Sequence, residues 1–157
     1  MAPFHLEAIT AGDCAVLRIA GEIDVYTAPE LRQQVINLAD NGTRHIVADL
    51  RDVDFLDSTG LGALVGSLRR LRLRQGSLKL VTSGGRVLQL FQITGLSRAF
   101  ALHPSVLEAI SAGQHWQTAL AGEGHSAEEH SAEEHSAEEH RAEEHRAEEW
   151  CRKHQLR

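Results

Sequence analysis

Apolar residues recur along the chain with two different periods, and the alternation of these periods predicts an α/β protein. Residues 4–9 alternate between apolar and polar, and a second short apolar run follows a turn, which predicts an opening β-hairpin. Farther along, compact apolar runs alternate with segments whose apolar residues recur at spacings of three and four. The predicted strands cover residues 4–9, 14–20, 45–50, 78–81 and 99–102, and the predicted helices begin near Thr27, Ser58, Arg86 and Pro104.

Capping and turn residues predict where these elements begin and end. Thr27 can cap the first helix, and Asn41-Gly42 is a typical helix stop. Residues 21–26 and 51–57 are predicted to be loops, the second leading directly into the helix at Ser58. The resulting order is β-β-α-β-α-β-α-β-α. Strand–helix–strand units favour parallel pairing with right-handed crossovers, so we expect a mixed sheet covered by helices.

Composition changes abruptly near the C-terminal end and divides the chain into three predicted parts. Residues 1–115 form the α/β domain, residues 116–124 a linker, and residues 125–157 a charged tail. Residues 125–149 of the tail are five tandem pentads, His-Ser-Ala-Glu-Glu or His-Arg-Ala-Glu-Glu. A period of five forms no apolar helix face, so we expect the tail to be helical or disordered, without packing into the core. His and Glu at helical spacing leave a metal site open as an alternative, although a solvated charged helix needs no metal.

Charge and composition exclude several classes of function. The chain carries a net charge of −6, and the tail accounts for most of it with ten Glu against four Arg and one Lys. Neither part has the basic surface that a direct nucleic-acid partner would require. We expect no signal peptide, no transmembrane helix and no membrane partner. The two cysteines form no disulfide framework or metal pair, which favours a reducing cytoplasm.

The most informative segment for chemistry is residues 52–64, where a charged stretch ends in a hydroxyl at a helix start. Amides at a helix N-terminus favour negative charge, so a phosphate on Ser58 would be tolerated locally while adding charge beside Asp57. Alternatively, Ser58 only caps the helix, and Thr59 is a competing phosphate acceptor. A serine hydrolase is not expected, because only the second glycine of the Gly-x-Ser-x-Gly motif is present and no histidine lies in a catalytic motif context. A Walker-type phosphate loop is also missing from the sequence.

The segment Asp57-Ser58-Thr59-Gly60-Leu61-Gly62 resembles the signature of STAS (sulfate transporter and anti-sigma antagonist) domains, specifically the bacterial anti-sigma factor antagonists. Two further segments resemble the same family: Gly21–Asp24 with residues 27–31, and residues 87–96. The similarity covers residues 4–112 and implies the STAS fold. It also implies that Ser58 is phosphorylated and that Asp24 helps to position its hydroxyl, although Asp24 could instead be only a turn residue before Thr27.

The resemblance implies a partner switch rather than an enzyme. The unphosphorylated protein would bind an anti-sigma factor of the histidine-kinase-like serine kinase type and so release a sigma factor. Phosphorylation of Ser58 would end binding, and a metal-dependent serine phosphatase would reset the protein. The chain would need no cofactor or metal, because ATP and Mg²⁺ belong to the kinase. It would be a monomer or weak dimer whose partner-binding residues are Asp24, Asp57, Thr59, Gly60, Leu61 and Gly62. Alternatives are an accessory subunit of a membrane transporter or a scaffold subunit of a stress-signalling complex.

Overall fold

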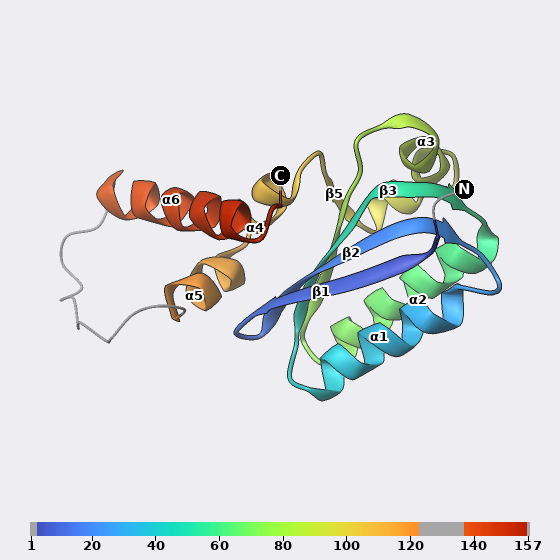
Figure 1. Cartoon of the computed structure of the whole chain (residues 1–157), viewed down its shortest axis with the longest axis horizontal. Coiled ribbons are helices and arrows are strands. Elements are labelled where there is room, and N and C mark those ends of the chain that lie inside the picture. The colour runs from blue at the N-terminus through green and yellow to red at the C-terminus, as the bar shows by residue number, and fades with distance from the viewer. Residues whose placement is uncertain (1–2, 123–136, 157) are drawn as a thin grey trace.

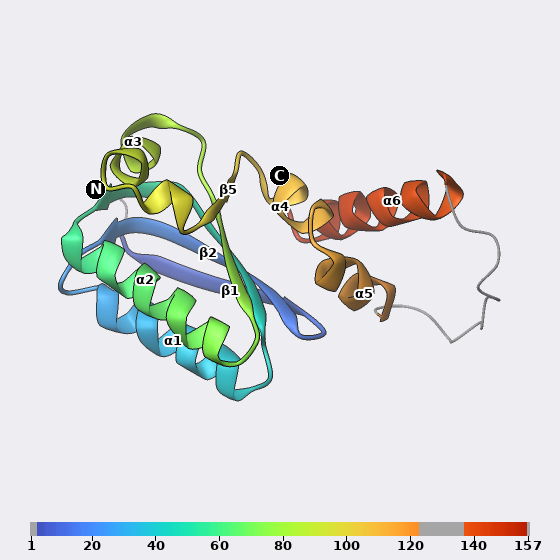
Figure 2. The same ribbon diagram turned by 180° about the vertical axis from the view of Figure 1, so that it is seen from behind.

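The computed structural model describes residues 3–122 and 137–156, and these residues form one five-stranded sheet with helices on both faces (Figures 1 and 2). The strands lie in the order β1-β2-β3-β4-β5, with β1 antiparallel to β2 and all other neighbours parallel. The predicted mixed α/β architecture is therefore confirmed. The strands are β1 (His5–Ala11), β2 (Cys14–Ile23), β3 (His45–Leu56), β4 (Ser77–Val81) and β5 (Ala101–His103). The helices are α1 (Ala28–Asp40), α2 (Ser58–Leu73), α3 (Gly85–Ile93), η1 (Leu96–Arg98), α4 (Val106–Ser111), α5 (Gln114–Gly122) and α6 (Ala137–Lys153).

Alternation along the strands divides the buried side chains between two cores. Leu17 and Ile19 of β2 point to the first core, which α1, α2 and α3 complete. Val16 of β2 and Val47 of β3 point to the second core, which α4, α5 and α6 cover. The longest parallel strands are consequently covered on both faces, which explains why the first six residues of β3 are all buried.

Two predicted loops are in fact extensions of strands. β2 continues to Ile23 and β3 continues to Leu56, and the two extensions pair in parallel up to Ile23↔Leu56. The prediction of a loop over residues 51–57 is therefore wrong for all but its last residue. Pairing satisfies the backbone of the charged stretch, so its polar composition does not prevent strand formation.

The predicted linker is also wrong for residues 116–122, because α5 occupies this part of the chain. Trp116 and Leu120 of α5 are buried against the second core. The last predicted strand is displaced toward the C-terminus, since Leu96–Arg98 forms a 3₁₀ turn before β5.

The tail packs on the domain, contrary to the expectation that it would not. In the described part of the tail, α6 lies beside α4 and α5 (Figure 1), and Trp150 is only 6% exposed. The rings of Trp116 and Trp150 meet edge to face with centroids 5.4 Å apart. Most of the apolar anchors, Trp150, Cys151 and Leu156, follow the pentads. The remainder of the predicted tail, residues 125–136 and residue 157, lies outside the described residues.

Candidate functional site

The candidate site lies where β2 and β3 end side by side. Ile23 pairs with Leu56, and the amide of Asp57 donates a hydrogen bond to the carbonyl of Ile23 at 3.3 Å. The segments that follow the two strands, residues 24–27 and 57–60, therefore lie at the same edge of the sheet. This pairing brings together two segments that are more than thirty positions apart in the sequence.

Asp57, rather than Ser58, caps α2. Asp57 has an extended backbone (φ −101°, ψ −174°), and its carboxylate accepts a hydrogen bond from the amide of Gly60 at 2.9 Å. Its carbonyl accepts the first helical hydrogen bond, from the amide of Leu61 at 2.9 Å. The alternative in which Ser58 only caps the helix is therefore wrong. Ser58 is the first helical residue and is exposed, so its hydroxyl is not committed to capping.

The two glycines of the signature have different environments. A Cβ on Gly60 would lie 2.6 Å from the carbonyl oxygen of Ile23 and 2.5 Å from Cδ1 of Leu56, so only glycine lets the helix start approach β2 this closely. A Cβ on Gly62 would meet nothing within 4 Å, because this residue faces solvent. Close approach to β2 thus explains the glycine at position 60 but not the glycine at position 62. Leu61 is 8% exposed and anchors the first turn in the core, whereas Thr59 is half-buried.

Asp24 organises the turn that leads into α1. Its Oδ1 accepts hydrogen bonds from the amide of Tyr26 at 2.9 Å and from the amide of Thr27 at 3.1 Å. The hydroxyl of Thr27 donates to the carbonyl of Glu22 at 2.7 Å and accepts from the amide of Asp24 at 2.9 Å. These bonds hold the loop beside Ser58 in one conformation. The turn role suggested as the alternative for Asp24 is therefore present, while a direct role toward Ser58 stays a prediction.

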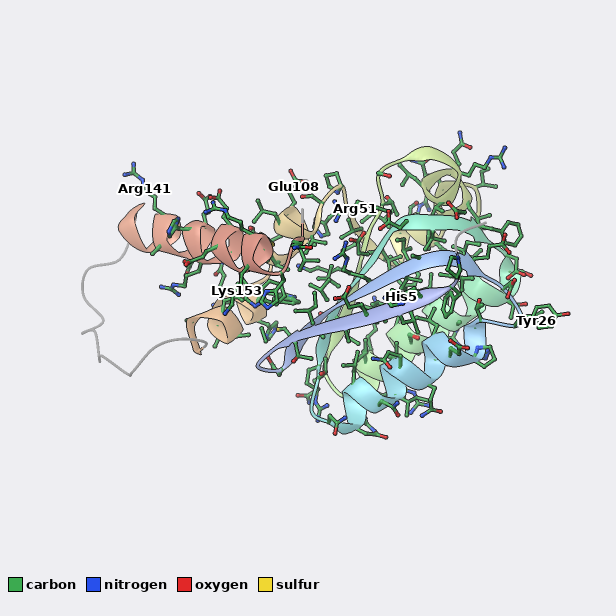
Figure 3. All side chains as sticks on the ribbon, in the orientation of Figure 1. His5, Tyr26, Arg51, Glu108, Arg141 and Lys153 are labelled. Carbon is green, nitrogen blue, oxygen red and sulfur yellow. The ribbon has the colours of Figure 1, made fainter. Side chains whose placement is uncertain are left out.

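Exposed apolar side chains at the same edge were not identified from the sequence. Val25 is 57% exposed, Tyr26 85% and Phe55 49%, and the side chain of Tyr26 projects away from the body of the protein (Figure 3). We call these three residues the apolar rim. Grouped exposed apolar residues are typical of binding surfaces. A signal existed in the sequence, since Phe55 stands among aspartates and Tyr26 among turn residues, but exposure cannot be read from residue type.

The acidic residues before Ser58 separate in the structure. Asp52 lines a hollow with Arg18, Arg51 and Gln155, whereas Asp54 lines another with Thr82 and Arg86. Because these residues belong to β3, they do not form one acidic loop around Ser58. Asp57 is the predicted carboxylate that lies directly at the helix start, whereas the carboxylate of Asp24 bonds within its own turn after β2.

Titratable groups also lie away from this edge, on the second face of the sheet. Asp49 holds Arg51 through two hydrogen bonds at 2.8 and 2.9 Å. His45 stacks on His115 with ring centroids 3.8 Å apart, and burial together with the neighbouring imidazole lowers the pKa of His45. Within the described residues, no three His, Cys, Asp or Glu side chains gather as a metal site. Nor does any helix among those residues combine the length and apolarity needed to cross a membrane.

Comparison with known proteins places this geometry in a family. Residues 5–109 match the STAS domain. The anti-sigma-B factor antagonist of Bacillus subtilis (strain 168) is 48% identical over 80 residues, which span 51% of this chain and 72% of that protein.

Solved structures show the same fold. The crystal structure of an anti-sigma factor antagonist from Mycobacterium paratuberculosis is 28% identical, with a TM-score of 0.65 over 70% of this chain and 93% of that one. The Bacillus cell fate determinant SpoIIAA in its phosphorylated form is 25% identical, with a TM-score of 0.56 over 70% of this chain and 98% of that one. The family match, the similar proteins and the topology agree: this chain belongs to the STAS-domain family.

Proposed function

We propose that this protein is an anti-sigma factor antagonist that acts as a partner switch in the cytoplasm. The observation that carries the proposal is the exposed hydroxyl of Ser58 at the first position of α2, at the same sheet edge as the apolar rim. The names of the similar bacterial proteins support the same function. The unphosphorylated protein binds an anti-sigma factor through this edge, and the sigma factor held by that anti-sigma factor is released.

The apolar rim and α2 together provide the binding surface. Val25, Tyr26 and Phe55 offer apolar area that is lost from water only when a partner covers it. Gly62 presents bare backbone on the exposed face of α2, one turn beyond Ser58, so a partner can approach closely there. A partner that covers the rim consequently surrounds the Ser58 hydroxyl.

Phosphorylation of Ser58 is the proposed off signal. A kinase domain in the anti-sigma factor supplies ATP and Mg²⁺, and this chain supplies only the attacking Oγ. A bond forms between Oγ and the γ-phosphorus, the bond to the ADP oxygen breaks, and the hydroxyl proton passes to a base on the kinase. A metal-dependent serine phosphatase hydrolyses the phosphoserine and restores the binding form.

The position of Ser58 lets the phosphate act on the partner while the fold is preserved. The first-turn amides of α2 and the helix dipole stabilise a dianion at this position. The amide of Gly60 is already bonded to Asp57, so the cap persists. A partner that covers the apolar rim would have to remove water from the phosphate charge, which weakens binding. The same charge repels acidic groups on the partner's side of the interface.

The proposal is tested by phosphorylation and binding with the cognate anti-sigma factor. Incubation with this kinase and ATP–Mg²⁺ should attach one phosphoryl group per chain, which Ser58→Ala abolishes and Thr59→Ala leaves in place. Calorimetry should then show the phosphorylated protein binding at least about a hundredfold more weakly, which corresponds to about 2.7 kcal/mol. A phosphoryl group that persists in Ser58→Ala, or equal affinity of both forms, would refute the switch.

The apolar rim has its own test, with a matched control. Tyr26→Ala should weaken binding about thirtyfold, the effect of losing an interface aromatic worth about 2 kcal/mol. Ile93→Ala is the control, because Ile93 is 83% exposed at the end of α3 and Tyr26 is 85% exposed. Equal losses in the two variants would place the interface elsewhere.

A further inference from the structure

Thr27 lies at the start of α1, but its side chain does not cap that helix. A capping hydroxyl accepts a hydrogen bond from the second or third amide of the helix. Pro29, at the second position, has no amide hydrogen, and the amide of Glu30 bonds to the backbone carbonyl of Thr27 at 3.0 Å. The expectation that the Thr27 side chain caps the first helix is therefore wrong, and its hydroxyl bonds elsewhere.

The hydroxyl of Thr27 bonds back to the end of β2 and to the turn that follows. It donates to the carbonyl of Glu22 at 2.7 Å and accepts from the amide of Asp24 at 2.9 Å. The carboxylate of Asp24 in turn accepts from the amides of Tyr26 and Thr27. Val25 and Tyr26 therefore lie between two side chains that bond to the backbone of this turn.

These bonds fix the two rim residues of the turn, because packing contributes little. The side chains of Val25 and Tyr26 are 57% and 85% exposed, so their positions depend on the backbone that carries them. Glu22, which accepts the Thr27 hydroxyl, pairs with Phe55 across the sheet. The same hydroxyl therefore fixes Val25 and Tyr26 relative to Phe55, the third residue of the apolar rim.

The helix start that carries Ser58 is held by the same strand end. The carbonyl of Ile23, the last residue of β2, accepts the amide of Asp57 at 3.3 Å. The Thr27 turn and the Ser58 helix are thus both bonded to the last two residues of β2, Glu22 and Ile23.

We propose that Thr27 is a positioning residue of this edge, and that its hydroxyl holds Val25 and Tyr26 in the conformation that the anti-sigma factor binds. The inference rests on the proposed function and names the residue that prepares its binding surface. A turn that is already ordered loses less conformational freedom when a partner covers it, so the affinity is higher. Thr27 acts through the turn and not on Ser58, so its hydroxyl contributes to binding and not to phosphoryl transfer.

Steady-state phosphorylation of the full-length chain by the cognate anti-sigma factor tests this role. Thr27→Val keeps the shape of the side chain and removes the hydroxyl, so it should raise the KM for this chain about tenfold, with kcat within about twofold of the wild type. Thr27→Ser keeps the hydroxyl and should bring the KM to within about threefold of the wild type. A loss of kcat at unchanged KM, or a serine variant as poor as the valine variant, would overturn the proposal.

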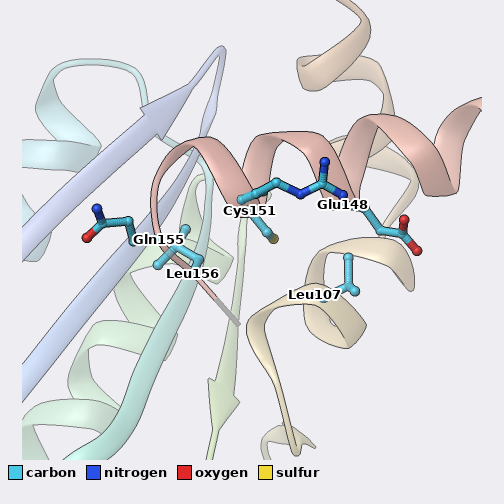
Figure 4. A pocket seen from close by; sticks show the side chains of 6 residues that line it. Leu107, Glu148, Cys151, Gln155 and Leu156 are labelled. Atoms are coloured by element: carbon cyan, nitrogen blue, oxygen red, sulfur yellow. The ribbon is translucent and has the colours of Figure 1, made fainter.

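Two control variants show whether loss of any hydroxyl bond, or of a group on another face, has the same effect. In Thr94→Val the lost hydroxyl also donates to a carbonyl at 2.7 Å, that of Leu90 in α3. Glu148 is exposed and lines the hollow between α4 and α6 (Figure 4), so Glu148→Gln changes a group over the second face of the sheet. Both controls should keep the wild-type KM. A KM raised as much in either control as in Thr27→Val would contradict the proposal.

A double variant tests whether Thr27 acts through Tyr26. In a Tyr26→Ala background the ring that the turn presents is missing, so adding Thr27→Val should raise the KM by less than about threefold. A full tenfold rise in this background would show that Thr27 acts elsewhere, against the proposal.

The free protein offers a measurement that needs no partner. Tyr26 is the only tyrosine of the chain, so isotope labelling of the tyrosine nitrogen gives one backbone amide signal, and this amide donates to Asp24 at 2.9 Å. Its hydrogen exchange should be at least about fivefold faster in Thr27→Val than in the wild type, and close to the wild type in Thr27→Ser and Thr94→Val.

The two measurements separate failure of this inference from failure of the proposed function. Normal phosphorylation of the wild type, with equal KM or equal amide exchange in Thr27→Val, would refute the role of Thr27 alone. Faster exchange in Thr27→Val with a wild-type chain that is not phosphorylated would refute the proposed switch, and with it the role of Thr27 in binding.

Discussion

Replacement of Gly60 and Gly62 by alanine offers a sharp test of how the helix start is positioned. A single residue separates Gly60 from Gly62, and both glycines belong to α2. The chemical change is the same, but the surroundings differ. A methyl group on Gly60 would lie 2.6 Å from the carbonyl oxygen of Ile23, whereas on Gly62 it would meet nothing within 4 Å.

The expected effects on the free energy of unfolding have opposite signs. In a helix interior, alanine is more favourable than glycine by up to about 1 kcal/mol, so Gly62→Ala should stabilise the protein by about that amount. In Gly60→Ala the helix start must move away from β2, and overpacking of this kind costs about 1–3 kcal/mol. The movement also stretches the bond from the amide of Asp57 to Ile23, already 3.3 Å long. We therefore expect the two variants to differ by about 2–4 kcal/mol.

Urea unfolding followed by circular dichroism and by tryptophan fluorescence measures this difference. Gly60→Ala should lower the midpoint and Gly62→Ala should raise it, with similar slopes if both unfold in one transition. Phosphorylation provides a second measurement, because displacement of α2 in Gly60→Ala moves Ser58 and should slow phosphoryl transfer. Equal midpoints for the two variants, or a stabilising Gly60→Ala, would refute the close approach of α2 to β2.

Three further predictions concern the cap, the tail and pH. Asp57→Ala should destabilise the protein by about 1 kcal/mol through loss of the helix cap. In the same urea assay, Ser58→Ala should change the free energy of unfolding by no more than about 0.5 kcal/mol. A larger loss for Ser58→Ala than for Asp57→Ala would show that Ser58 is the cap. Trp150→Ala should lower the free energy of unfolding by about 3–5 kcal/mol if α6 stays docked, and the loss should not exceed that caused by truncation after residue 122. A truncation that leaves the melting temperature unchanged would show that α6 does not pack. The pKa of His45 is lowered in the folded state, so just below pH 6.5 the unfolded chain binds more protons than the folded chain does. The free energy of unfolding should therefore fall as the pH drops through this range and recover above it. Melting temperatures recorded from about pH 5 to 8 measure this dependence, and His45→Gln should make it less steep.

Local patterns in the sequence determined most of the elements and the position of the candidate phosphoacceptor. Apolar residues that recur every second position, or at spacings of three and four, predicted the order β-β-α-β-α-β-α-β-α. These spacings are informative because a strand or a helix buries one face, so its apolar residues recur with the period of that element. The predicted helix start at Ser58 is confirmed to the residue. The signature around it also indicated the STAS family, which the comparison confirms.

Only the tertiary structure decided how residues distant in sequence meet. Asp57 and Ser58 are both good caps, and the choice between them depends on the amide of Asp57 bonding to the end of β2. The length of β3 depends equally on its partner, since residues 51–56 read as a polar loop until β2 pairs with them. Exposure of Tyr26 and Phe55 follows from where the sheet ends, which no local pattern records.

The C-terminal region shows the same division most clearly. The pentads indicated a solvated helix, and by period alone they form no apolar face. Docking of α6 comes from the edge-to-face contact between Trp116 and Trp150, thirty-four positions apart, and from Leu156 beyond the end of the helix. The period of a sequence pattern shows which face of a segment can be buried. It does not show whether a surface is available to bury that face. For α6 that surface is formed by α4, α5 and the second face of the sheet, and it exists only after the chain has folded.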